Sequence, residues 1–241
     1  MSKRLEGKVA VVTGGNSGIG RATALAFARE GARVVIGARR VEEGEAVVRE
    51  IESAGGEAVF VATDVTDAAQ TEALVAEAVE RFGGLDIAFN NAGMEGTGLR
   101  TLAEDDADNV RSLLEVNVLG VWNAMKAELP ELTRRGGGVI INTSSVAGQR
   151  GFGAFSGYVA SKFAVEGLSR SVAQEVAAAG IRVNTVAPGP IETDLFERTT
   201  GGDADLFVSH VPAGRAGRPE DVADAVVFLA RGESRDVTSQ A

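Results

Sequence analysis

Short apolar runs alternate with segments of helical composition along the chain, and this alternation restricts the possible folds more than any other feature. The runs are rich in valine and isoleucine and stop at glycines or polar residues. Runs that are apolar throughout are typical of strands buried on both faces of a parallel sheet. The pattern predicts strands at 8–13, 33–37, 58–62, 86–90, 139–142 and 182–186, and helices at 21–30, 42–53, 68–82, 106–129, 156–179 and 219–230.

Repeated strand–helix units of this length predict the α/β class, with a doubly wound parallel sheet of Rossmann type flanked by helices on both faces. The 241 residues contain no linker, repeat or low-complexity tract, so we expect a single domain spanning 1–241. The stretch 191–217 lacks clear periodicity. Because long irregular segments in compact domains are often lids or substrate loops, we expect it to border a substrate.

Rare residue types exclude several chemistries. The chain has no cysteine and a single histidine, His210, so thiol catalysis, disulfides and cysteine–zinc sites are excluded and no metal site is predicted. A serine hydrolase that uses histidine would depend on His210, and no Gly-x-Ser-x-Gly elbow is present. The formal net charge of −10 disfavours a nucleic-acid partner, which requires a basic surface.

The same sequence gives no sign of a membrane or export segment. No apolar run approaches the roughly 18 residues of a spanning helix. The first residues are charged and lack the apolar centre of a secretory signal. We therefore expect a cytoplasmic protein with no membrane partner.

A glycine-rich turn, 13–20, follows the first predicted strand and opens the first helix. Bare backbone amides at a helix amino end can hold a phosphate-bearing ligand. The turn lacks the Lys-Ser/Thr of a nucleotide-hydrolysing loop, since Arg21 and Ala22 stand there, and its glycines also depart from Gly-x-Gly-x-x-Gly. The alternative is a turn that serves only strand–helix packing. The candidate cofactor-binding residues of the turn are Gly14, Asn16, Ser17, Gly18, Ile19 and Gly20.

The end of the second predicted strand bears on cofactor choice. An acid here binds the adenosine ribose of NAD, whereas an arginine accepts the 2′-phosphate of NADP. This strand ends in Arg39 and Arg40 with no acid, which favours NADP(H) over NAD(H). The alternative is that both arginines open a solvated helix and pair with Glu42 and Glu43.

Tyr158 and Lys162 lie four residues apart in a predicted helix, so their side chains share one face. A nearby ammonium stabilises a phenolate and lowers the tyrosine pKa from its usual value near 10. Tyr158 is therefore a plausible general acid and base, with Lys162 tuning it. Ser144 and Ser145 follow a central predicted strand, at the carboxyl end where open α/β sheets bind ligands.

Taken in order, these motifs resemble the short-chain dehydrogenase/reductase family over nearly the whole chain. The matching segments are Thr13-Gly14 with Gly18-Ile19-Gly20, Asp64-Val65, Asn90-Asn91-Ala92-Gly93, Asn117, Ser145 before Tyr158-x-x-x-Lys162, and Pro188-Gly189-Pro190-Ile191-Glu192-Thr193. Tyr-x-x-x-Lys alone is common, whereas the full ordered set is specific.

The resemblance implies roles for four catalytic residues. Ser145 would hydrogen-bond the substrate carbonyl, Tyr158 would protonate it during reduction, and Lys162 would bind the nicotinamide ribose. Asn117 would hold a water in the proton relay. Further cofactor contacts implied by the family are Asp64 and Val65 at the adenine, Asn91, Ala92 and Gly93 in the groove, and Pro188, Gly189, Ile191 and Thr193 near the nicotinamide.

Single members of this set also have ordinary structural interpretations. Asn117 could satisfy backbone groups, Asp64 could cap the following helix, and Thr193 could be a turn residue. Trp122 is interpreted as a packing or subunit-contact residue, and His210 as a loop residue.

The resemblance also implies features beyond the cofactor site. The family pattern continues past the last helix with another apolar strand, whereas this sequence stops where that strand would begin, so we expect the strand to be absent. Relatives are commonly homodimers or homotetramers built on the long helices. The predicted substrate pocket is apolar with few charges and is formed by Glu95, Ala147, Gln149, Phe152, Phe155, Leu195 and Phe196.

The resulting prediction is an NAD(P)-dependent oxidoreductase that interconverts a medium-sized ketone and a secondary alcohol. A 3-oxoacyl-[acyl-carrier-protein] reductase is an alternative within the same class. A non-catalytic nucleotide-sensing protein on the same fold is the alternative from a different class.

Overall fold

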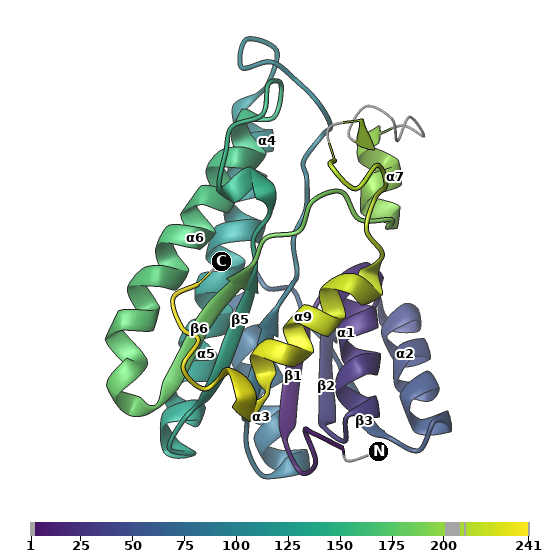
Figure 1. The fold of residues 1–241 in the computed structure, drawn as a ribbon, viewed down its shortest axis with the longest axis vertical. Coiled ribbons are helices and arrows are strands. Elements are labelled where there is room, and N and C mark those ends of the chain that lie inside the picture. Colours follow the sequence, from purple (N-terminus) through teal and green to yellow (C-terminus); the bar gives the residue numbers. More distant parts are fainter. Residues whose placement is uncertain (1–2, 201–207, 210, 241) are drawn as a thin grey trace.

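The computed structural model describes residues 3–200, 208, 209 and 211–240, and a six-stranded parallel sheet lies at its centre (Figure 1). The strand order is β3-β2-β1-β4-β5-β6, with a crossover between the two halves at β1 and β4. The predicted doubly wound α/β fold is therefore confirmed. The strands are β1 (Val9–Thr13), β2 (Arg33–Ala38), β3 (Glu57–Ala62), β4 (Ile87–Asn90), β5 (Gly138–Thr143) and β6 (Ile181–Val186).

Two layers of helices cover the sheet, as Figure 1 shows, with α6 at the left edge of the view and α9 crossing in front. One face packs against α1 (Gly18–Arg29), α2 (Val41–Ser53) and α9 (Pro219–Ala230). The opposite face packs against α3 (Ala68–Phe82), α5 (Gly120–Arg134) and α6 (Ser156–Val176).

Side chains along β1 explain why its sequence is apolar throughout. Ala10 and Val12 belong to the core with α1 and α9, whereas Val9 and Val11 belong to the core with α3 and α5. Successive side chains point to opposite faces of a strand, so both faces require apolar residues when both are covered.

The predicted helix 106–129 is wrong in its continuity and in its end. The structure divides it into α4 (Ala107–Leu114), a wider π-helical turn (Glu115–Leu119) and α5. Helix α5 also continues through Pro130 to Arg134, although proline removes a hydrogen-bond donor from a helix interior. The π-turn places Asn117 at the point where α4 passes into α5.

The predicted irregular stretch 191–217 contains a helix, α7 (Asp194–Thr200), in its described part. An isolated parallel bridge joins Ile191 to Gly217 and so brings the two ends of this stretch together. His210, interpreted from the sequence as a loop residue, lies outside the described residues. In Figure 1, α7 lies near the upper end of the molecule, far from the amino terminus.

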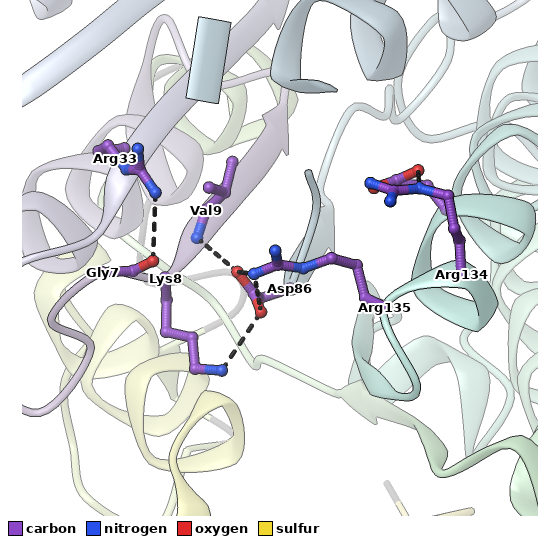
Figure 2. Close-up of polar contacts among 8 residues, drawn as sticks. Gly7, Lys8, Val9, Arg33, Asp86, Arg134 and Arg135 are labelled. Atoms are coloured by element: carbon purple, nitrogen blue, oxygen red, sulfur yellow. Dashed lines mark hydrogen bonds and ion pairs between the residues drawn. The ribbon is translucent and has the colours of Figure 1, made fainter. Parts of the chain in front are cut away.

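At the amino ends of the strands, Asp86 joins three parts of the chain (Figure 2). Its carboxylate accepts hydrogen bonds from the Val9 amide at 2.9 Å and from Lys8 Nζ at 3.2 Å. A guanidinium nitrogen of Arg135, just after α5, donates to both carboxylate oxygens at 2.9 and 3.0 Å. Burial alone would raise the pKa of Asp86, but these donors outweigh it and lower the pKa.

The last described residues run along the outer edge of β6. The Ser239 amide donates to the Val183 carbonyl at 2.8 Å, and the Thr185 amide donates to the Gln240 carbonyl at 2.8 Å. Residues 237–240 therefore occupy the edge of the sheet beside β6.

Candidate active site

A cavity of about 950 Å³ lies where the loops that follow the strands converge with α7. Ligands bind to open α/β sheets at this end, beside the point where the strand order reverses. Of the predicted cofactor-binding and catalytic residues, all but Gly20 and Asn117 line this cavity. Those that line it are Gly14, Asn16, Ser17, Gly18, Ile19, Arg39, Arg40, Asp64, Val65, Asn91, Ala92, Gly93, Ser145, Tyr158, Lys162, Pro188, Gly189, Ile191 and Thr193.

The glycine turn is built for close backbone approach. Gly14 and Gly18 have positive φ angles of 63° and 50°, which favour glycine. Gly20 lies behind the cavity, and a Cβ there would be 2.2 Å from the Gly14 carbonyl oxygen. Gly20 thus allows α1 to pack directly on the turn.

Helix α1 begins at Gly18, three residues earlier than predicted. Ser17 precedes it in extended conformation, and its side chain makes no capping hydrogen bond. The first-turn amides of α1 thus lack a side-chain acceptor beside a cavity lined by Ser17, Gly18 and Ile19. These amides fit the phosphates of a dinucleotide.

Arg39 and Arg40 differ in their surroundings. With its amide oxygen toward Arg40, Asn16 accepts from two guanidinium nitrogens of that residue, each at 3.0 Å. Arg40 also pairs with Glu43 at 3.0 Å, as the alternative interpretation expected for it. Arg39 is exposed, lines the cavity and makes no ion pair within the described part of the chain.

Asp64 does not cap the following helix. Its carboxylate accepts from the Thr66 amide at 3.0 Å and the Thr66 hydroxyl at 2.8 Å, whereas Asp67 caps α3. The capping interpretation of Asp64 is therefore wrong, and its loop borders the cavity.

The end of β4 is tied to the glycine turn. The Thr13 hydroxyl accepts from the amides of Asn91 at 3.0 Å and Ala92 at 3.2 Å, and the Asn91 side chain donates to the carbonyls of Thr13 and Gly14 at 3.3 Å. These bonds fix the floor of the groove at the crossover between the halves of the sheet.

The Asn117 side chain satisfies backbone groups, as one interpretation of it expected. It accepts from the Met94 amide at 2.8 Å and donates to the Met94 carbonyl at 2.9 Å and to Ser161 Oγ at 3.0 Å. Both amide donors are thus used, which anchors the loop after β4 to the π-turn and to α6. The role of Asn117 in holding a water stays a prediction.

Ser145, Tyr158 and Lys162 meet on one wall of the cavity. Ser145 begins a short 3₁₀ turn (Val146–Gly148) after β5, and its hydroxyl hydrogen-bonds the Tyr158 phenol. Lys162 Nζ lies 5.6 Å from the Tyr158 ring centroid and donates to the Thr143 carbonyl at 2.9 Å. Phe155 stacks on the tyrosine ring with centroids 4.7 Å apart.

The expected lowering of the tyrosine pKa is wrong for this structure. Burial raises the pKa of Tyr158 to about 12; the Ser145 hydrogen bond opposes the rise and the Glu95 charge adds to it. Burial also lowers the pKa of Lys162 to about 8, against the opposing effect of Glu166. The Lys162 amine donates to the Thr143 carbonyl, and desolvation is the largest effect on the pKa of the phenol.

The part of the cavity expected to hold the substrate has the predicted lining except at Gln149, and it carries more charged side chains than expected. Gln149 instead lines a separate hollow beside Phe163 and Arg170. Charged side chains that were not predicted from the sequence also border the cavity, so the prediction of a pocket with few charges is wrong. The predicted lining residues confirmed by the structure are Glu95, Ala147, Phe152, Phe155, Leu195 and Phe196, and the additional charged ones are Arg150, Asp194 and Arg198.

Two contacts organise these charges. Arg198 of α7 lies 3.8 Å from Glu95, which follows β4. The Arg150 guanidinium lies 4.8 Å from the Phe152 ring centroid. The contact between Arg198 and Glu95 has no local sequence signal, because these residues are far apart in the sequence and meet only in the folded chain.

The described residues contain no group of three or more histidine, cysteine, aspartate or glutamate side chains that could hold a metal ion. Over the same residues, none of the helices combines the length and the apolar character needed to cross a membrane.

The fold and the site together define a class: a Rossmann-fold oxidoreductase with a Ser–Tyr–Lys group beside a dinucleotide groove. Residues 8–203 match the model of the short chain dehydrogenase family. The chain therefore belongs to the short-chain dehydrogenase/reductase family, and the predicted resemblance is confirmed.

Individual relatives share nearly the whole chain. The 2,5-dichloro-2,5-cyclohexadiene-1,4-diol dehydrogenase LinX of Sphingobium indicum is 40% identical over 99% of this chain and 94% of its own length. The 3-oxoacyl-[acyl-carrier-protein] reductase FabG of Thermotoga maritima is 40% identical over 98% of this chain and 96% of its own. The crystal structure of levodione reductase superposes with a TM-score of 0.95 at 36% identity, covering 98% of this chain and 95% of that one.

Proposed function

We propose that the protein interconverts a ketone and a secondary alcohol with NADP(H), and that Tyr158 is the general acid and base. The observation that carries this proposal is the convergence of the Ser145 hydroxyl, the Tyr158 phenol and the Lys162 amine on one wall of a cavity that begins at the glycine turn. Membership of the family supports the reaction class.

In this proposal each side chain has a separate task. NADP(H), when bound, supplies or accepts the hydride. The Ser145 hydroxyl hydrogen-bonds the carbonyl oxygen and orients it toward Tyr158. The phenol gives its proton to that oxygen as negative charge develops, so one hydride and one proton convert the ketone to the alcohol. In the reverse direction the phenolate takes the alcohol proton.

Protonation sets the pH dependence. Because the pKa of Tyr158 is raised to about 12, the phenol is protonated at neutral pH and ready to act as an acid. Alcohol oxidation requires the phenolate, so its rate is expected to rise with pH across the alkaline range. Ketone reduction is expected to persist at neutral pH.

The preference for NADPH rests on Arg39. Its guanidinium borders the cavity without an ion pair within the described residues, whereas Arg40 is held by Asn16 and Glu43. A free arginine fork suits a phosphate monoester. Arg39 is therefore proposed as the main partner of the 2′-phosphate, with NAD(H) the weaker cofactor.

The proposed substrate is a medium-sized, largely apolar ketone or secondary alcohol. Phe152, Phe155, Leu195 and Phe196 supply the apolar lining. The relative that oxidises a cyclohexadiene diol favours including ring ketones in a test panel. The FabG relative keeps a 3-oxoacyl thioester as the second candidate.

We also propose a homodimer or homotetramer that uses the long helices. Trp122 is 50% exposed on α5 and Phe163 is 46% exposed on α6. Large apolar side chains on these helices support a subunit contact there. A cytoplasmic location remains a prediction from the sequence.

The experiment is a panel of ring ketones, aliphatic ketones and a 3-oxoacyl thioester, assayed with NADPH and NADH. Tyr158→Phe keeps the ring that stacks on Phe155 but removes the hydroxyl, so turnover is expected to fall about 100-fold or more. NADPH binding, measured by calorimetry, should change little. Undiminished turnover in this variant contradicts the mechanism, and a panel without turnover in the unmodified protein favours the nucleotide-sensing alternative.

A further inference from the structure

Glu166 is a buried carboxylate one helical turn after Lys162 on α6. Residues four apart on a helix face the same side, so the two groups are neighbours. Glu166 is 3% exposed and Lys162 is 5% exposed. Glu166 does not border the substrate cavity, so its burial is not explained by contact with substrate.

The Glu166 carboxylate is held in place from β6. Thr185 Oγ1 lies 3.1 Å from each of its two oxygens and donates its proton to them. Arg170, one turn further along α6, lies 3.5 Å away, but its side chain is 57% exposed, so water screens its charge. A second cation, the Lys162 amine, belongs to the residue one helical turn earlier, and the Glu166 charge raises its pKa.

The 3₁₀ turn after Ser145 covers this part of α6. A Cβ on Gly148 would lie 2.4 Å from Ser144 Oγ, 3.0 Å from the Lys162 carbonyl and 3.1 Å from Glu166 Cγ. The absence of a side chain at Gly148 therefore lets the turn lie directly on the Lys162–Glu166 segment. Glu166 also borders the hollow lined by Gln149 and Arg170, but it is only 3% exposed. In such surroundings an ion without a counter-ion is strongly disfavoured.

The groups from β5, the turn after it and β6 that pack against the pair carry no formal charge, whereas α6 itself contributes Arg170. Thr143 and Ser144 come from β5 and the turn after it, and Thr185 comes from β6. Within α6, Tyr158 faces Lys162 and Arg170 faces Glu166. Glu95, from the loop after β4, acts on Tyr158.

We propose that Glu166 is a positioning residue for the reaction: its buried carboxylate, fixed by Thr185, keeps the Lys162 amine protonated beside Tyr158. The consequence for catalysis rests on the proposed function of Tyr158 and Lys162. Burial lowers the pKa of Lys162 to about 8 while Glu166 raises it, so loss of the carboxylate would make the amine neutral at physiological pH.

The lysine charge can be measured without an activity assay. The chain has only four lysines, Lys3, Lys8, Lys126 and Lys162, so NMR of protein labelled with [¹³C]lysine yields four Cε signals. The signal lost in Lys162→Met identifies Lys162. Glu166→Gln keeps an acceptor for Thr185 but removes the charge, and we expect the Lys162 titration midpoint to fall by about one pH unit or more.

Matched variants make the test decisive. Glu175→Gln removes an exposed charge from the same helix and should leave the midpoint unchanged. Glu166→Asp keeps the charge and should restore part of the shift. Circular dichroism checks that each variant folds. An unchanged Lys162 midpoint in folded Glu166→Gln overturns the proposal.

Activity then separates this proposal from the proposed function. If the midpoint falls, Glu166→Gln should move the acidic limb of alcohol oxidation to higher pH, because a neutral lysine stabilises the phenolate less. If the Lys162 titration midpoint falls but the acidic limb of alcohol oxidation does not move, the proposed role of Lys162 in the reaction is contradicted. If the midpoint falls and Tyr158→Phe keeps full turnover, the proposed role of Tyr158 is contradicted. In both cases the assignment of Glu166 as the group that maintains the lysine charge stands.

Discussion

Adjacent residues of the same type can differ in function because their partners differ, as Arg39 and Arg40 illustrate. From the sequence, both arginines were predicted to lie at the end of the second strand, and both were candidates for binding the 2′-phosphate of NADP. In the structure, Arg40 is bound by Asn16 and Glu43, whereas Arg39 borders the cavity. The partner Asn16 lies in the glycine turn, so this distinction depends on how two loops approach each other.

Replacing Arg39 therefore tests cofactor choice at the scale of one residue. Arg39→Ala is expected to weaken NADPH binding about 10-fold or more, since a charge-assisted contact with a phosphate is lost. NADH binding should change little. Titration calorimetry with both cofactors measures this, and Arg40→Ala is the control with the smaller expected effect. Equal losses for NADPH and NADH would contradict the 2′-phosphate assignment.

The neighbouring positions of Tyr158 and Lys162 could be predicted, because residues four apart in a helix lie on the same face. The protonation of the pair could not. The pKa of Tyr158 depends on burial and on Glu95, which arrives from the loop after β4. The pKa of Lys162 depends on burial by the turn after β5 and on Glu166. Local spacing carries no information on such desolvation.

At the scale of elements, most strands and helices could be predicted, because each alternates strongly in composition with its neighbours. Helix α3 has the predicted bounds, Ala68–Phe82, with Asp67 as its cap and Gly83 in left-handed conformation after it. The division between α4 and α5 was not predictable, because the π-turn is bonded to Met94 through Asn117. That contact is long-range.

Helix α5 also carries Glu128 into the core, 1% exposed. Asn90 donates to it at 3.2 Å, and the Asn90 Oδ1 atom is buried without a partner. Burial raises the pKa of Glu128 from 4.5 to about 8, so the folded protein holds this proton at neutral pH. A protonated carboxyl or a neutral amide suits this position better than a carboxylate.

The raised pKa makes stability depend on pH in a definite direction. Between about 4.5 and about 8 the folded state binds one proton more than the unfolded state, so the free energy of unfolding falls as pH rises across this window. Glu128→Gln removes that dependence and should stabilise the protein by about 1–3 kcal/mol at pH 7.5. Urea unfolding at pH 5 and 7.5 measures it, with exposed Glu115→Gln as the control. A variant that is less stable at pH 7.5 and keeps the pH slope would show that Glu128 is not the group responsible.

At the scale of the whole molecule, the two ends of the sheet have different tasks. The carboxyl ends hold the cavity, where loops are irregular and polar groups remain open to a ligand. The amino ends are closed by Asp86, which joins β1, β4 and the segment after α5 (Figure 2). The cavity end could be predicted, because open α/β sheets bind ligands at the carboxyl ends of their strands. The Asp86 cluster could not, because it depends on residues 8, 86 and 135 meeting in space.

Asp86 is accordingly expected to support the fold and not the reaction. Asp86→Asn removes the charge that Val9, Lys8 and Arg135 bind, and should lower the free energy of unfolding by about 2 kcal/mol at pH 7. Because the pKa of Asp86 is lowered on folding, the carboxylate stabilises the protein above its unfolded value of 3.8 and this stabilisation is lost as pH falls through the folded pKa. The stability difference should therefore narrow below pH 3.8.

Asp108→Asn, at an exposed ion pair with Arg111, serves as the control and should cost little. Denaturant unfolding at several pH values measures the stability of both variants. NADPH affinity should remain unchanged in Asp86→Asn, because the Asp86 cluster lies at the opposite end of the sheet from the cavity. A loss of NADPH affinity in a fully folded variant would contradict this division of tasks.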